Sequence, residues 1–244
     1  MLEARGLCKS FGDIAAVRGV SFSARDGQIT GLLGPNGAGK STTLRMFYTV
    51  MKPDQGDAFI DGVSVTADPL AARRAIGVLS HGAGVYNHLT ARENIHYFGE
   101  LHGLVRAERE ARAAELIELL EMQPFADRLA KGFSQGQKLK TALARSLVHK
   151  PKNLLLDEPT NGLDVMAVRG LRKLLTQLRD AGHCVLFSSH VMQEVEQLCD
   201  EVVMIAGGQV VAAGTLADIR ARGGDRLEDA FVALMGDDKP EATK

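Results

Sequence analysis

The sequence is poor in cysteine, in aromatic residues and in net charge. It has three cysteines, no tryptophan and only 5% aromatic residues among its 244 residues. The cysteines Cys8, Cys184 and Cys199 lack the spacing of a metal or redox motif, so we expect reduced thiols and a cytosolic compartment. The formal net charge of -1 provides no basic field, which argues against nucleic acid as a partner.

The chain also lacks any long apolar run. A helix that spans a bilayer needs about 20 mostly apolar residues, and no segment of the sequence approaches this length. Residues 1–5 lack the apolar segment of a signal peptide. We therefore expect any link to a membrane to pass through a partner. The composition is nevertheless 45% apolar, which is enough to bury a full core.

A glycine-rich segment at residues 34–42 is the strongest motif in the chain. It reads GPNGAGKST and fits the phosphate-loop pattern, in which two glycines bracket four residues and Lys and Ser follow. Residues 28–33 read as the buried strand that enters such a loop, and residues 43–47 as the helix that leaves it. The residues predicted to contact a nucleotide are Asn36, Gly37, Ala38, Gly39, Lys40, Ser41 and Thr42.

The residue types of this segment match the chemistry of phosphate binding. Glycines allow positive φ angles, so that several backbone N–H groups point at one anion, and the helix start adds the positive end of its dipole. Lys40 would place a charge near the β- and γ-phosphates, and the Ser41 hydroxyl would ligate Mg²⁺. A glycine-rich turn without a ligand is the alternative, but the predicted strand and helix on either side favour nucleotide binding.

Two carboxylates follow the apolar run at residues 154–156. In an open parallel sheet, ligands collect at the carboxyl ends of the strands. Asp157 is a candidate Mg²⁺ ligand, directly or through water. Glu158 is the best candidate to orient and deprotonate an attacking water. An acidic pair that only solvates a strand end is the alternative, which the phosphate loop earlier in the chain disfavours.

The order of apolar segments predicts an α/β fold. Residues 2–9 and 15–24 read as strands of an antiparallel edge sheet, and the turn between them holds Phe11, which either stacks on a base or covers the sheet edge. Strands that alternate with helices imply right-handed crossovers and a mainly parallel sheet. The strands expected after residue 70 are 75–79, 153–156, 183–187, 201–205 and 209–213.

Residues 89–150 carry no strong strand pattern and are predicted to be a helical insert. Thr90 and Glu93 have the spacing of a capping box. Residues 106–121 are amphipathic, with Leu116, Leu119 and Leu120 expected on one side. Two more helices are expected near the C-terminus, at residues 216–222 and 227–235. A loose tail is expected at residues 236–244.

Three other motifs have both a structural and a functional interpretation. Ser134 and Gln137 fit a capping box, whereas Gly136 between them would let an anion approach the helix N-terminus. Asp164 fits the N-cap of the helix that follows it. Residues 161–164 also look like a guanine-reading Asn-Lys-x-Asp motif, but they have Gly in place of the Lys, which argues against a GTPase. His190 ends an apolar strand, where a structural and a catalytic role both stay open.

These motifs, in this order and spacing, resemble the ATP-binding subunit of ABC transporters over nearly the full chain. The matched parts are the adenine-stacking aromatic (Phe11), the Walker A motif (34–42), the signature motif (133–137), Walker B with its catalytic Glu (154–158), the D-loop (161–164) and the switch histidine (His190). Among such subunits, the chain is most similar to exporter types, such as sodium-extruding and multidrug ABC-2 exporters.

Two positions depart from the family pattern. Gln135 replaces the first glycine of the signature motif, while Ser134 and Gly136 remain to contact the γ-phosphate. His81 stands where the family usually has the Q-loop glutamine, which contacts Mg²⁺ and relays to the membrane subunit. An imidazole can form one such hydrogen bond, but it can also take up a proton. We therefore expect His81 to alter coupling, and not nucleotide binding.

The resemblance implies a P-loop NTPase core with a mainly parallel sheet, an antiparallel β edge subdomain and a helical insert. The implied divisions of the single domain 1–244 are a RecA-like core (1–88 and 151–222), its antiparallel part (near 1–25 and 57–66), a helical subdomain (about 89–150) and a C-terminal helix and tail (223–244). Catalysis is expected from Glu158, His190 and Lys40, with Mg²⁺ on Ser41 and Asp157. Further contacts to ATP are expected from Ser134, Gly136, Gln137, His81 and Asp164.

The implied function is ATP hydrolysis that drives export through a separate membrane permease, at the cytoplasmic face of the membrane. A second copy, or a related ATP-binding subunit, would pair head to tail and complete each site; sodium and drugs are the candidate substrates. The alternatives are a soluble ABC-type ATPase, a nucleotide-gated binding module and a small-molecule kinase. Glu158 argues against a module without turnover, and no acceptor site for a kinase is recognisable.

Overall fold

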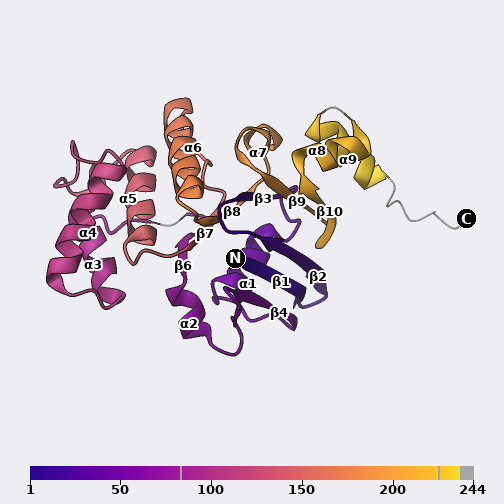
Figure 1. Ribbon diagram of the computed structural model, residues 1–244, viewed down its shortest axis with the longest axis horizontal. Helices are drawn as coiled ribbons and strands as arrows, with labels where there is room; N and C mark the ends of the chain where they lie inside the picture. The colour runs from indigo at the N-terminus through magenta and orange to yellow at the C-terminus, as the bar shows by residue number, and fades with distance from the viewer. Residues whose placement is uncertain (83, 225, 237–244) are drawn as a thin grey trace, which may run out of the picture.

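Two β-sheets form the centre of the molecule (Figure 1), and the computed structural model describes residues 1–82, 84–224 and 226–236. The smaller sheet is antiparallel throughout, with the strand order β2-β1-β4-β5. Its strands are β1 (Leu2–Phe11), β2 (Ile14–Ala24), β4 (Gln55–Ile60) and β5 (Val63–Ser64). The predicted antiparallel sheet at the start of the chain is thereby confirmed.

The turn between β1 and β2 is shorter than the sequence pattern predicts. Phe11 is the last residue of β1 and pairs with Ile14, instead of lying in the turn. Gly12 has a φ of 56°, a conformation that lets two residues reverse the chain. The Phe11 side chain therefore projects from a strand end, where it is 48% exposed.

The larger sheet has the strand order β10-β9-β3-β8-β7-β6. Only β10 is antiparallel to its neighbour, so the predicted α/β fold with a mainly parallel sheet is confirmed. Its strands are β3 (Ile29–Leu33), β6 (Ile76–Leu79), β7 (Asn153–Asp157), β8 (Cys184–Ser189), β9 (Glu201–Ala206) and β10 (Gln209–Thr215). Because β3, β8 and β7 are neighbours, their carboxyl ends meet at one place on the sheet edge.

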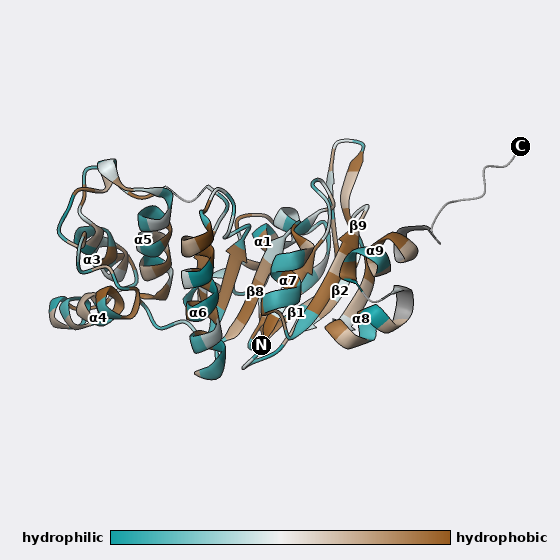
Figure 2. Ribbon diagram, turned by 90° about the horizontal axis from the view of Figure 1, so that it is seen from above, coloured by the Kyte–Doolittle hydropathy of each residue, from teal (hydrophilic) through white to brown (hydrophobic). Residues whose placement is uncertain are grey.

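The larger sheet is buried on both faces. Along β7, Leu154 and Leu156 belong to one hydrophobic cluster, and Leu155 belongs to the other. Helix α6 (Val165–Asp180) contributes to the first cluster and α1 (Lys40–Phe47) to the second. Figure 2 shows strand β8 in hydrophobic colours between α6 and the more hydrophilic α7. A strand covered on both sides needs apolar residues at successive positions, which explains the uninterrupted apolar runs of the sequence.

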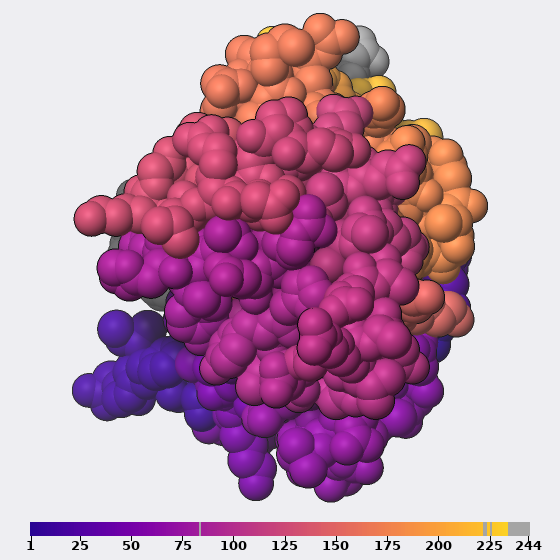
Figure 3. All heavy atoms as spheres, turned by 90° about the vertical axis from the view of Figure 1, so that its left-hand side faces the viewer, coloured from indigo at the N-terminus to yellow at the C-terminus, as the bar shows by residue number. Residues whose placement is uncertain are grey.

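Helices α3–α5 stand together at one end of the molecule (Figure 1). The face on that side, seen in Figure 3, is formed mostly by residues between about 85 and 150, with the first strands projecting at one edge. Thr90 caps α3 with a complete capping box, as predicted. The remaining helices are α2 (Pro69–Arg74), α3 (Ala91–Leu101), α4 (Arg106–Leu119), the short 3-10 helix Ala130–Gly132, α5 (Gln135–Leu147), α7 (Met192–Leu198), α8 (Leu216–Gly223) and α9 (Leu227–Gly236).

Two details differ from the sequence-based expectations. Helix α2 lies outside the predicted elements, although Asp68 caps it and Pro69 begins it, which is a recognised helix start. Leu119 is 39% exposed, because it lies about 100° around the axis of α4 from Leu120 and falls outside the buried stripe. The two predicted C-terminal helices are confirmed as α8 and α9. Gly236, the first residue of the predicted tail 236–244, is the last residue of α9, and the rest of that tail lies outside the described residues.

Candidate active site

The phosphate loop connects the end of β3 to the start of α1, as predicted. Gly39 has a φ of 101°, and a Cβ atom there would lie 2.5 Å from the carbonyl oxygen of Ala16. A Cβ atom on Gly34 would lie 2.1 Å from the carbonyl oxygen of Ile205. Both positions therefore require glycine, because neighbouring strands approach the loop so closely.

The turn between β9 and β10 is hydrogen-bonded to the phosphate loop and supports it. The backbone N–H of Gly208 donates to the carbonyl of Ala38 at 3.1 Å, and the Gly208 carbonyl accepts from the N–H of Arg18 at 2.7 Å. This turn is a supporting element that a motif search misses, since its glycine pair is 170 residues from the loop and reads only as a turn.

Lys40 is buried at the base of the loop, with 5% of its side chain exposed. Its ammonium donates to the carbonyls of Gly34 at 2.8 Å and Pro35 at 3.1 Å, and it lies 3.5 Å from Glu158 Oε1. One carboxylate and two carbonyls hold the charge close to the loop, where an incoming phosphate would meet it.

Asp157 ends β7 and is 2% exposed. Its Oδ1 accepts hydrogen bonds from Ser41 Oγ at 2.9 Å and from Ser188 Oγ at 2.7 Å. Its Oδ2 is buried and has no hydrogen-bond partner among the described residues. A buried carboxylate oxygen without a partner, beside a serine hydroxyl, is a donor set that fits Mg²⁺.

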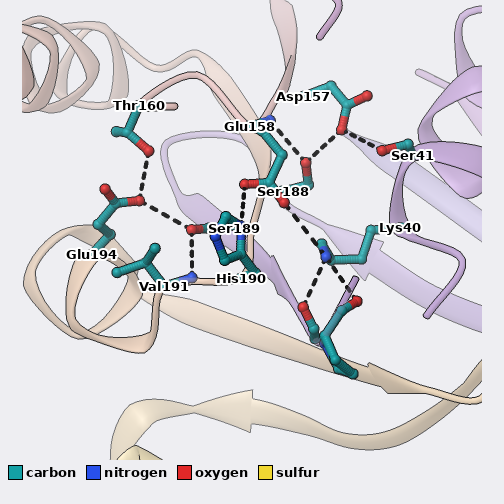
Figure 4. A network of polar contacts seen from close by, with 12 residues as sticks. Lys40, Ser41, Asp157, Glu158, Thr160, Ser188, Ser189, His190, Val191 and Glu194 are labelled. Atoms are coloured by element: carbon teal, nitrogen blue, oxygen red, sulfur yellow. Dashed lines mark hydrogen bonds and ion pairs between the residues drawn. The ribbon is translucent and has the colours of Figure 1, made fainter. Parts of the chain in front are cut away.

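Glu158 and His190 face each other beside the loop (Figure 4). His190 Nδ1 lies 2.8 Å from Glu158 Oε2. The backbone of Glu158 has a φ of 50°, a left-handed conformation that costs a non-glycine residue about 1–2 kcal/mol. Its N–H donates to Ser188 Oγ at 3.0 Å, which helps to hold this conformation. The Glu158 side chain is only 12% exposed, so its carboxylate acts in a partly desolvated environment.

An open cleft of about 530 Å³ joins these groups, a volume in the usual range for ligand pockets. The residues that line it are Phe11, Ala16, Asn36, Gly37, Ala38, Gly39, Lys40, Ser41, Thr42, His81, Glu158, Asn161 and His190. The structure thus brings most of the predicted site residues together, and it adds Ala16 and Asn161. A second depression of about 330 Å³ separates Glu158 from Gln135 and Lys138 at the start of α5.

Asp157 lines this second depression and not the 530 Å³ cleft, although the Ser41 hydroxyl that it bonds does line the cleft. Four other predicted site residues line neither of the two. Ser134 and Gln137 form a reciprocal capping box on α5, with bonds of 3.3 and 3.0 Å, as the structural interpretation predicts. Asp164 caps α6 through the N–H of Ala167 at 2.8 Å. Gly136 lies beside Ala167, and a Cβ atom on it would lie 3.5 Å from Ala167 Cβ. Contacts of these four residues with a nucleotide stay a prediction.

Comparison with known proteins gives a consistent set of relatives. The family model described as "ABC transporter" matches residues 17–161. The chain is 42% identical over 223 residues to the ABC transporter ATP-binding protein NatA of Bacillus subtilis (strain 168), covering 91% of this chain and 90% of that protein. It is 37% identical to the linearmycin resistance ATP-binding protein LnrL of the same organism, covering 93% of this chain and 73% of the relative.

Solved structures share the fold. The chain matches an ATP binding subunit of an ABC transporter with a TM-score of 0.87 and 29% identity, over 96% of this chain and 99% of that chain. It also matches the dimeric structure of a post-hydrolysis state of the ATP-binding cassette MJ0796 bound to ADP and Pi, with a TM-score of 0.79 and 27% identity. That match covers 88% of this chain and 99% of the other.

Proposed function

Since the chain belongs to the ABC transporter family, we propose that its cleft hydrolyses Mg-ATP with Glu158 as the base, and that hydrolysis drives export through a separate permease. Family membership makes the chain an ATP-binding subunit of an ABC transporter and an ATPase. The single observation that supports the assignment of roles is the Glu158 carboxylate, which lies between the Lys40 ammonium and the His190 ring.

The cleft offers one position for each part of the nucleotide. The Phe11 ring, exposed at the end of β1, is available to stack on the adenine. The phosphates would lie along the loop and the N-terminus of α1, where Lys40 would exchange its bonds to loop carbonyls for bonds to phosphate oxygens. Ser41 and Asp157 would hold Mg²⁺, whose charge would offset that of the phosphate oxygens.

Hydrolysis follows from the residues around Glu158. A water beside its carboxylate would attack the γ-phosphorus while the bond to the β–γ bridging oxygen breaks, and its proton would pass to the carboxylate. His190 would fix the orientation of that carboxylate through the 2.8 Å contact and would face the γ-phosphate with its other nitrogen. Lys40 would stabilise the negative charge that develops on the phosphoryl oxygens.

Two copies of the chain would complete each site. Ser134, Gly136, Gln137 and Asp164 do not line the cleft of their own chain, so we propose that a second subunit presents them head to tail. The proposed helical subdomain, about 89–150, and His81 at the cleft would pass the motion to the permease.

No helix among the described residues is long and apolar enough to cross a bilayer. We propose that the chain lies at the membrane by binding its permease, and that the transporter exports sodium or drugs. The relative LnrL, a linearmycin resistance protein, supports drug export.

The variant Glu158→Gln tests the role of Glu158. We expect it to bind ATP with wild-type affinity, to hydrolyse it at least about 10²-fold more slowly, and to accumulate as an ATP-bound dimer in light scattering. Loss of the base should block turnover and leave the phosphate loop intact. Glu118→Gln, on the exposed side of α4, is the matched control and should keep full activity. Full turnover by Glu158→Gln would refute Glu158 as the base.

A further inference from the structure

A second polar cluster lies beside the Glu158–His190 pair, on the side away from Lys40 in Figure 4. Glu194 Oε2 accepts two hydrogen bonds, one from Thr160 Oγ1 at 2.7 Å and one from Ser189 Oγ at 3.0 Å. We call these three residues the Glu194 clamp. None of them lines the cleft, so they have no direct contact with a nucleotide there.

The clamp fixes the backbone on both sides of His190. Ser189 is fully buried at the end of β8. Its hydroxyl donates to Glu194 and accepts from the backbone N–H of Val191 at 3.0 Å. Because His190 lies between Ser189 and Val191, the position of its ring depends on the Ser189 hydroxyl and on the Glu194 carboxylate that this hydroxyl bonds.

The clamp also holds the segment that carries Glu158. Thr160 lies two residues after Glu158, within two successive tight turns: the N–H of Asn161 donates to the Glu158 carbonyl at 3.2 Å, and that of Leu163 to the Thr160 carbonyl at 3.1 Å. Glu158 keeps a left-handed φ of 50°, which persists only where the surroundings hold it. The bond from Thr160 to Glu194 provides such a restraint.

Glu194 is not used to cap its own helix. It is the third residue of α7, a position where glutamate commonly reaches back to the N-cap backbone N–H. Here the N-cap is Val191, and its N–H donates to Ser189 instead. The Glu194 carboxylate therefore accepts from two hydroxyls on different segments, that of Thr160 in the loop that follows β7 and that of Ser189 at the end of β8.

We propose that Glu194 is a positioning residue for ATP hydrolysis. Its carboxylate joins Thr160 to Ser189, and this link holds Glu158 and His190 at hydrogen-bond distance in the reactive arrangement. The proposal rests on the proposed function, in which Glu158 is the base. Since the phosphate loop and Lys40 lie on other elements, the clamp should govern the chemical step and leave ATP affinity unchanged.

The experiment compares steady-state ATPase kinetics of three variants, each within the full chain and its permease complex. Glu194→Ala removes the acceptor, and we expect kcat to fall about tenfold or more while KM for ATP stays within about twofold. Glu194→Gln keeps one oxygen that can accept both hydroxyls, and it should restore kcat to within about threefold of wild type. Thr160→Val removes one donor and should lower kcat with the same unchanged KM.

Glu196→Ala is the matched control. Glu196 lies on the same helix, two residues away, and it bonds the N–H of Leu227 at 3.0 Å and Arg220 at 3.1 Å, away from the cleft. Both alanine variants lose a part-buried carboxylate, so a general loss of stability would affect them alike. Only Glu194→Ala should lower kcat.

The outcomes separate this proposal from the proposed function. Wild-type kcat in Glu194→Ala, with Glu158→Gln inactive, would overturn the clamp and leave Glu158 as the base. Equal losses in Glu194→Ala and Glu196→Ala, or a rise in KM alone, would also overturn the clamp. If Glu194→Ala does not fold, Thr160→Val decides: wild-type kcat in that variant refutes the proposal. Full turnover by Glu158→Gln would instead refute the proposed function.

Discussion

His149 follows α5, and its ring stacks on that of His102 at a centroid separation of 3.7 Å. Its Nε2 lies 2.9 Å from the carbonyl oxygen of Ile76, which assigns the proton to Nε2, and its Nδ1 is buried without a partner among the described residues. Burial, followed by the charges of His102 and Arg112, lowers the pKa of His149 to about 4. The folded protein therefore favours the neutral ring.

This depressed pKa predicts acid sensitivity. The unfolded chain takes up a proton on His149 near pH 6.5, but the folded chain does so only near pH 4. The contribution of the neutral His149 ring to the free energy of unfolding is therefore complete above pH 6.5 and is lost as the pH falls towards 4. The slope is at most about 1.4 kcal/mol per pH unit. His149→Gln, which keeps an N–H donor for Ile76, should lose less stability between pH 7 and pH 5 in urea unfolding. His88→Gln is the exposed control, and equal losses in wild type and His149→Gln would contradict the prediction.

Individual residues also mark the limit of sequence-based prediction. Lys40, Ser41 and Asp157 are identifiable because phosphate and Mg²⁺ chemistry demands those residue types at fixed spacing, although contact with a ligand stays a prediction. Glu194 gives no such signal, because a glutamate in the first turn of a helix usually caps that helix. Its direction towards Thr160 depends on how α7 packs, which only the tertiary structure shows.

At the scale of elements, the β9–β10 turn is predicted to support ATP binding. Gly208 has a φ of 82°, and a Cβ atom there would lie 2.8 Å from the Ala16 carbonyl oxygen, so Gly208→Ala should push the turn away from Ala38. We expect ATP affinity to fall about tenfold in isothermal titration, because one lost support of the loop is worth about 1.4 kcal/mol.

Gly62→Ala is the matched control for that variant. Gly62 has the same φ of 82°, with no atom within 4 Å of a Cβ there, and it does not line the cleft. Both substitutions carry the backbone cost of a left-handed alanine, about 1–2 kcal/mol. Equal ATP affinity in the two variants would show that the turn does not support the loop.

Periodicity and capping signals recovered the long elements, and local geometry explains the differences. Strands buried on both faces are apolar throughout, so β7 and β8 are readily recognised. Helix α2 spans only six residues and has too few apolar positions to show a period, which is why only its cap signals it. Phe11 belongs to β1 because a positive φ at Gly12 shortens the turn, which a residue count does not reveal.

At the scale of the whole molecule, the proposed dimer predicts complementation. Glu158→Gln disables the base of its own cleft, and Gly136→Asp places a carboxylate at the surface that would face the partner's phosphates. Each variant alone should be inactive. In a head-to-tail dimer of one of each, one site keeps both an intact base and an intact signature motif. A refolded equimolar mixture should therefore recover about a quarter of wild-type ATPase activity.

The measurement is phosphate release against mixing ratio, with a maximum expected at equal amounts. Gly136→Asp should fold, because a Cβ atom there lies 3.5 Å from Ala167 Cβ, an ordinary contact distance. No recovery at any ratio would mean that one chain supplies the whole site.

Strand order has a consequence for how the protein is made. In the larger sheet β3 lies between β8 and β9, both of which are encoded more than 150 residues later. On the ribosome, the strand that leads into the phosphate loop therefore emerges early and waits for most of translation without a neighbour in its own sheet. Nascent chains should become able to retain ATP only after residue 206 has left the exit tunnel, so premature termination yields fragments that cannot sequester nucleotide.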